Sequence, residues 1–93
     1  MTTNATENRY TGLINNYISR MPIDPNGRII SLGEGNTPLI ECHNIELLKK
    51  YNIRLLLKYE GLNPTGSFKD RGMTMAVTKA VQDGSRAIIC AST

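Results

Sequence analysis

The chain of 93 residues has no tryptophan, one phenylalanine, one histidine and two cysteines, and it has no long apolar run. Two distant thiols and the single His43 give no zinc-ligand spacing, so we expect no metal site. We expect Cys42 and Cys90 to pack as small apolar residues in a reducing cytoplasm. No stretch is long enough to span a membrane, and the N-terminus lacks a signal-peptide core. These absences favour a soluble, cytoplasmic protein.

The charges are also sparse and scattered. The formal net charge is +3, and Lys49 and Lys50 are the only adjacent pair among the eleven lysines and arginines. Few aromatic side chains accompany them, so the sequence does not suggest a nucleic-acid partner. The apolar fraction of 40% is typical of a folded globular chain of about one small domain.

Apolar periodicity and turn-forming residues predict short elements in the first half of the chain. We expect a helix over residues 9–20, a loop over 21–27, an extended piece over 28–32, a loop over 33–38, a strand over 39–41 and a helix from 43 or 44 to 50. His43 fits a helix start better than a catalytic base. The two glycines of the 33–38 loop suit either an ordinary turn or a ligand-binding loop.

The second half predicts a strand, a helix and a second strand. Residues 53–58 contain three consecutive leucines, residues 67–82 have helical periodicity, and residues 86–91 include Ala-Ile-Ile-Cys, which is apolar on both faces. This order predicts a βαβ unit with a parallel sheet, and hence an α/β fold. The chain stops at the carboxyl end of its last expected strand, before the sheet has neighbours, so we infer a fragment.

The loop over residues 60–72 leads into the expected helix. Ser67 can act as its N-cap and Asp70 as the capping-box partner, near the positive end of the helix dipole. Lys69 does not fit this arrangement, because a protonated amine is disfavoured there. It is either a lysine whose head reaches water or a neutral amine kept for chemistry.

The helix also divides into two stripes. Lys69 shares an apolar stripe with Met73, Ala76 and Ala80, so we expect its amine to face inward. The opposite stripe is polar and is expected to face solvent. It comprises Arg71, Thr74, Thr78 and Gln82.

Four segments resemble a known family. Residues 63–72 read Asn-Pro-Thr-Gly-Ser-Phe-Lys-Asp-Arg-Gly, residues 32–39 read Leu-Gly-Glu-Gly-Asn-Thr-Pro-Leu, residues 58–60 read Lys-Tyr-Glu, and residues 91–93 read Ala-Ser-Thr. Together they resemble the pyridoxal-phosphate enzymes related to the tryptophan synthase β subunit and, within that superfamily, the threonine synthases. The resemblance covers residues 32–93, whereas residues 1–31 match only vaguely.

The resemblance implies a fold type II architecture, a three-layer αβα arrangement with an open parallel sheet, incomplete here. Residues 1–31 would form an N-terminal helix and loop, and residues 32–93 the start of the cofactor domain, truncated. The implied cofactor is pyridoxal 5'-phosphate, bound as a Schiff base through Lys69, which would also be the catalytic base and acid. Ser92 and Thr93 match the start of the loop that receives the substrate carboxylate. A homodimer is implied for the full-length protein.

The implied reaction converts O-phospho-L-homoserine and water to L-threonine and phosphate, the last step of threonine biosynthesis. A free amine suits it, because only the unprotonated amine condenses with an aldehyde. Two alternatives stay open: a related enzyme, such as a serine or threonine dehydratase or a cysteine synthase, and an inactive fragment. In the second alternative, the inactive fragment would bind an anion at the start of the helix.

The other residues of the lysine motif have simpler interpretations. We expect Asp70 to be a helix-start acceptor and Arg71 a charge on the outer face. Asn63 and Thr65 are expected to shape the loop through hydrogen bonds from side chain to backbone. None of these residues is expected to contact the ligand directly.

Overall fold

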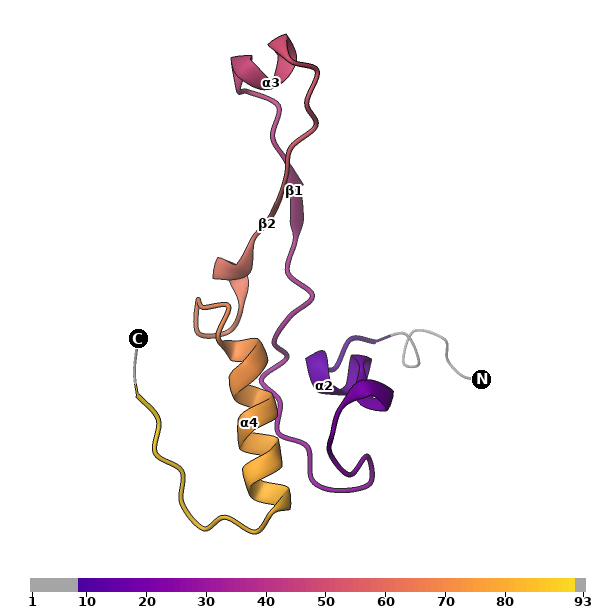
Figure 1. Ribbon diagram of the computed structural model, residues 1–93, viewed down its shortest axis with the longest axis vertical. Coiled ribbons are helices and arrows are strands. Elements are labelled where there is room, and N and C mark those ends of the chain that lie inside the picture. Colours follow the sequence, from indigo (N-terminus) through magenta and orange to yellow (C-terminus); the bar gives the residue numbers. More distant parts are fainter. Residues whose placement is uncertain (1–8, 92–93) are drawn as a thin grey trace.

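The computed structural model describes residues 9–91, which form an open, elongated arrangement (Figure 1). Its radius of gyration is 17.6 Å, whereas a compact chain of this length has one of about 12 Å. The elements in chain order are α2 (Leu13–Asn16), the 3-10 helix η1 (Ile18–Arg20), β1 (Leu39–Glu41), α3 (Glu46–Lys50), β2 (Leu56–Lys58), the 3-10 helix η2 (Glu60–Leu62) and α4 (Asp70–Gln82). Among these described residues, no helix is long and apolar enough to cross a membrane.

A β-hairpin projects from the rest of the molecule. Strands β1 and β2 pair antiparallel, with Leu39 opposite Lys58 and Glu41 opposite Leu56, and α3 caps the far end (Figure 1). The predicted strand over 39–41 is confirmed. The strand predicted over 53–58 is shorter than expected, and it is exposed rather than buried.

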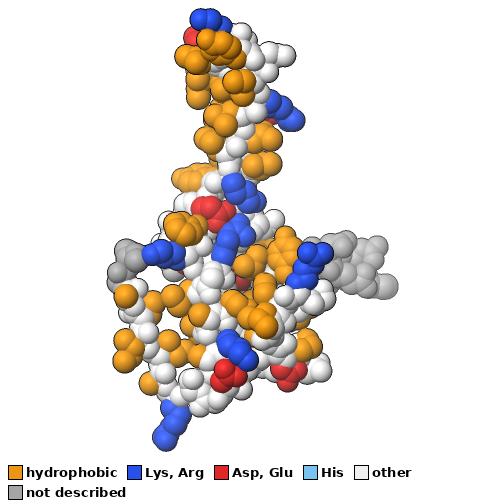
Figure 2. Space-filling view, in the orientation of Figure 1, with side chains coloured by type: hydrophobic (Ala, Val, Ile, Leu, Met, Phe, Trp, Pro, Cys, Tyr) orange, Lys and Arg blue, Asp and Glu red, His pale blue; other side chains and the backbone are white. Residues whose placement is uncertain are grey.

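The expected βαβ unit is not formed in the described part of the chain. Residues 86–91 adopt no strand, and the Ile89 side chain is 99% exposed. A parallel strand needs a neighbour to accept its backbone hydrogen bonds and a layer to cover each face. Residues 9–91 supply neither, and apolar side chains remain visible over the hairpin and around the C-terminal segment (Figure 2).

The first predicted helix is confirmed only in part. Residues 13–20 split into α2 and η1, and Tyr17 separates them with a non-helical backbone. Ile14 in α2 is the one fully buried hydrophobic side chain of residues 9–91. The two cysteines were expected to be packed, but Cys42 is half-buried and Cys90 is exposed.

Helix α4 packs through the stripe that was expected to face solvent. Thr78 is fully buried, and its hydroxyl accepts a hydrogen bond from the Ile30 N–H at 2.9 Å. Gln82 accepts from the Asp24 N–H at 2.8 Å and donates to the Asp24 carbonyl at 2.9 Å. The prediction was wrong because the segment over residues 24–37 is irregular. Its backbone groups therefore take polar side chains as partners.

Candidate functional site

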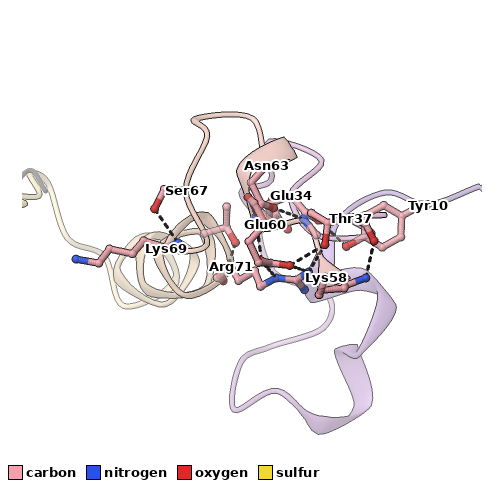
Figure 3. A network of polar contacts seen from close by, with 11 residues as sticks. Tyr10, Glu34, Thr37, Lys58, Glu60, Asn63, Ser67, Lys69 and Arg71 are labelled. Carbon is pink, nitrogen blue, oxygen red and sulfur yellow. Dashed lines mark hydrogen bonds and ion pairs between the residues drawn. The ribbon is translucent and has the colours of Figure 1, made fainter. Parts of the chain in front are cut away.

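Lys69 lies at the junction between the motif loop and α4. Helix α4 begins at Asp70, three residues later than the expected N-cap Ser67, and the Ser67 hydroxyl accepts a hydrogen bond from the Lys69 backbone N–H at 3.1 Å. The Lys69 side chain is exposed and extends away from the polar cluster on the other side of the helix (Figure 3). The expectation that its amine would face a buried apolar stripe is wrong for this structure, since Met73 is exposed too.

A hollow of about 380 Å³ lies beside Lys69. Its lining comes from the motif loop, the first turn of α4 and the end of the described chain: Thr65, Ser67, Lys69, Asp70, Met73, Cys90 and Ala91. Residues 90 and 91, distant in sequence, therefore reach the side of the helix that carries Lys69. Ser92 and Thr93, the predicted substrate-binding residues, lie outside the described residues.

Two residues of the motif close the turn before Lys69. Asp70 is buried, and its Oδ2 accepts a hydrogen bond from the Thr65 N–H at 2.8 Å. Its Oδ1 accepts a second one from the Thr65 hydroxyl. The expected role of Asp70 as an acceptor at the helix start is confirmed, and its partner is the loop rather than the first turn.

Arg71 forms an ion pair with Glu60 across the same loop. The Arg71 Nε lies 2.6 Å from Glu60 Oε1, and its Nη2 lies 2.9 Å from Glu60 Oε2 and 3.2 Å from the Thr37 hydroxyl (Figure 3). Arg71, together with bonds from Thr37 and Asn63, lowers the pKa of Glu60 to about 2. The prediction that Arg71 is a charge on the outer face was wrong, because Arg71 shares the packed stripe with the buried Thr74 and Thr78, three and seven residues later.

Asn63 joins the motif loop to the loop over residues 33–38. Its side chain is buried, accepts a hydrogen bond from the Gly35 N–H at 2.8 Å and donates to the Glu60 carbonyl at 2.9 Å. The prediction that Asn63 shapes the loop through backbone contacts is confirmed. Its contacts also place the two glycine-containing loops next to each other.

Glu34 anchors the N-terminal segment to this assembly. The carboxylate is fully buried and accepts hydrogen bonds from the Leu13 N–H at 2.7 Å, the Leu32 N–H at 2.9 Å and the Ser31 hydroxyl at 3.0 Å. Burial raises the pKa of Glu34, but these donors outweigh burial and the net pKa is lowered. The carboxylate is thus held ionised, in the manner of a structural anchor.

Sequence reasoning missed Glu34 and Glu60 as organising residues. Each is a lone carboxylate next to glycine in a turn-rich segment, in Gly33-Glu34-Gly35 and Glu60-Gly61. A carboxylate in such a segment can collect several donors that no regular structure pairs, which are mainly backbone N–H groups for Glu34 and side-chain donors for Glu60. That composition is the signal that could have identified them.

Known proteins match most of the length of this chain. A family model described as "Pyridoxal-phosphate dependent enzyme" matches residues 30–93. The chain is 57% identical over 84 residues to a threonine synthase of Bacillus sp. (strain ULM1), with 90% of this chain and 23% of the relative covered. Identity to the threonine synthase of Halalkalibacterium halodurans is 52% over 85 residues, which covers 91% of this chain and 23% of the relative. Identity to the threonine synthase of Mycobacterium tuberculosis (strain ATCC 25618 / H37Rv) is 51% over 89 residues, which covers 96% of this chain and 24% of the relative.

The chain thus spans about a quarter of the length of these curated relatives. The matched region includes the complete motif loop, Lys69 and all of α4. The family match over residues 30–93 and the identities to these relatives lead to one conclusion: this chain belongs to the family of pyridoxal-phosphate dependent enzymes.

Proposed function

We propose that a full-length protein carrying this chain is a threonine synthase, which converts O-phospho-L-homoserine and water to L-threonine and phosphate. The observation that carries the proposal is the placement of Lys69, an exposed primary amine at the rim of a hollow. Identities of 51% to 57% to threonine synthases across the same segment support the choice of reaction.

The residues around the hollow fit pyridoxal 5'-phosphate. An accessible amine can bond covalently to the cofactor aldehyde, and the hollow of about 380 Å³ is open beside it. The hydroxyls of Thr65 and Ser67 also line the hollow, although each already has a partner within the loop. When bound, the cofactor supplies an electron sink for the carbon chemistry.

In this proposal Lys69 holds the cofactor and then moves protons. Its Nζ removes one proton from the substrate Cα and one from Cβ as phosphate leaves Cγ. It then returns one proton to Cγ and, once water has added its hydroxyl at Cβ, one to Cα, while the remaining proton, from water, goes to the released phosphate. Ser92 and Thr93 receive the substrate carboxylate. Residues 90 and 91, which precede them, already line the hollow beside Lys69.

The finer architecture belongs to the same proposal. We propose that residues 86–91 join an open parallel sheet within a three-layer αβα domain when the remaining three quarters of a family-length chain is present. The exposed apolar side chains of this segment and of the hairpin support it, because such surface is normally covered. We further propose that the full-length protein is a cytoplasmic homodimer without nucleic-acid or membrane partners. In this chain we place the boundary between the N-terminal helix and loop and the cofactor domain between residues 31 and 32.

A chimera tests the reaction. It consists of this chain in place of the matching segment of the Bacillus sp. threonine synthase, and it is supplied with the cofactor. We expect phosphate release from O-phosphohomoserine, loss of release in Lys69→Ala, and retention in the matched control Lys79→Ala, whose side chain is exposed on the same helix. Turnover of serine or threonine without phosphate release would instead identify a dehydratase and contradict the proposal.

The isolated chain of 93 residues is expected to be inactive. Only Ile14 forms a buried apolar core in residues 9–91, which is too little to offset the entropy of ordering the chain. We expect no stable cofactor attachment in the isolated chain, measured as protein-bound cofactor after gel filtration. Stoichiometric attachment to this short chain would contradict that expectation.

A further inference from the structure

The loop that presents Lys69 has little apolar packing of its own. Leu62 is 57% exposed and Phe68 is 63% exposed, and the buried side chains of residues 60–70 are the polar Asn63 and Asp70. Hydrogen bonds and charge therefore fix this loop. Hydrophobic contacts fix it much less.

One ion pair joins the two ends of this loop. Glu60 is the first residue of η2, and Arg71 follows Lys69 by two positions in the first turn of α4. Closing a loop of this length costs conformational entropy, so a contact that holds its ends together restricts everything between them. Lys69 lies inside the segment that is restricted in this way.

The chemistry of the pair suits this task. The guanidinium donates to both Glu60 oxygens, at 2.6 and 2.9 Å, and also reaches the Thr37 hydroxyl at 3.2 Å. A planar fork makes these contacts with one fixed orientation, which a lysine ammonium cannot do. Both side chains are little more than a quarter exposed, so water screens the pair only in part.

We propose that the Glu60–Arg71 pair positions Lys69: it holds the loop so that the Lys69 amine points into the hollow, and it thereby sets the rate of covalent cofactor attachment. Both members are positioning residues, because they lie on the opposite side of the helix from the amine (Figure 3). This inference rests on the proposed function. A misplacement of about 1 Å can slow a reaction about 100-fold, so loosening the loop should affect the attachment step directly.

The test is the rate of cofactor attachment in the chimera after its own cofactor has been removed. Pyridoxal 5'-phosphate is added, the absorbance change is followed, and borohydride trapping at timed intervals counts the attached fraction. We expect Arg71→Gln to slow attachment by about tenfold or more. The attachment rate of Arg71→Lys should lie between those of Arg71→Gln and the unsubstituted chimera, because lysine keeps the charge but loses the planar fork of the guanidinium.

The matched control is Arg54→Gln. Arg54 also pairs with a glutamate, Glu41, at 2.8 Å, but it does so on the hairpin. We expect the Arg54→Gln rate to equal that of the unsubstituted chimera. Should Arg71→Gln not fold, Glu60→Gln, which keeps the side-chain shape, gives the same comparison.

Two results would overturn the inference: attachment at the unsubstituted rate in both Arg71→Gln and Glu60→Gln, or an equal slowing in Arg54→Gln. A purely structural role would lower thermal stability without slowing attachment at temperatures where every variant is folded. Failure of the unsubstituted chimera to attach the cofactor at Lys69 is a different result, because it refutes the proposed function itself.

Discussion

Asp70 and Thr65 face each other across the turn that leads into Lys69. Asp70 Oδ2 accepts a hydrogen bond from the Thr65 N–H at 2.8 Å, and Oδ1 accepts one from the Thr65 hydroxyl. Because Asp70 is buried, water cannot easily replace these bonds. Asp70, the neighbour of Lys69, thus fixes the turn, so the motif stabilises its own conformation.

Replacing Asp70 by Asn should destabilise this turn. An amide keeps one acceptor oxygen but loses the charge, so the two charge-assisted hydrogen bonds to Thr65 are replaced by weaker neutral ones, at a cost of about 1 kcal/mol. We expect a lower thermal midpoint for the Asp70→Asn chimera. Asp83→Asn is the control, since Asp83 is exposed and pairs only with Lys79 at 3.3 Å. An equal shift in both variants would contradict the interpretation.

Thr78 should matter more than Thr74, although both are buried. The Thr78 hydroxyl accepts from the Ile30 N–H at 2.9 Å, whereas the Thr74 hydroxyl donates to the Arg71 carbonyl within the same helix. Thr78→Val leaves the part-buried Ile30 N–H without its partner, which costs about 1 kcal/mol. We expect Thr78→Val to lower the urea midpoint of the chimera more than Thr74→Val does. A larger loss in Thr74→Val than in Thr78→Val would contradict the hydrogen bond between Thr78 and Ile30.

Gly35 is predicted to resist substitution for two separable reasons. Its φ of +84° is unfavourable for other residues, and a Cβ there would collide with the Tyr10 hydroxyl. Gly33 has a φ of +78° with open space around it. We therefore expect Gly35→Ala to lower the thermal midpoint more than Gly33→Ala. Adding Tyr10→Phe should restore part of the difference, and no restoration would argue against the collision.

The Glu60–Arg71 pair should make stability depend on pH in the acid range. The folded-state pKa of Glu60 is about 2, against 4.5 for the ordinary group. The ionised carboxylate therefore stabilises the fold fully above pH 4.5, and this contribution is lost as the pH falls toward 2. We expect the thermal midpoints of the chimera and its Glu60→Gln variant to converge over this interval. A constant difference would contradict the assignment.

The sequence predicted the local features of this site well. Turn formers located the motif loop, β1 was found from its short apolar run, and the motif singled out Lys69 without any coordinates. Asn63 and Asp70 were assigned as loop-shaping and helix-start residues because their side chains have few other uses in such turns. These predictions depended on contacts within a few residues.

The contacts between distant segments could not be predicted in this way. Arg71 and Thr78 looked like a solvent-facing stripe, since periodicity separates polar from apolar residues but does not reveal an irregular backbone that needs polar partners. The expected strand over 86–91 failed for a related reason. Its apolar pattern describes a central strand, and residues 9–91 provide no neighbour for it.

Peptide mapping after borohydride reduction tests the central claim most directly. The chimera is loaded with pyridoxal 5'-phosphate, reduced and digested, and the labelled peptide is identified by mass spectrometry. We predict the label on the Lys69 Nζ, its loss in Lys69→Ala and its retention in Lys79→Ala. A label on another lysine, such as Lys58, whose amine donates to the Thr37 carbonyl, or no label at all, would contradict the assignment.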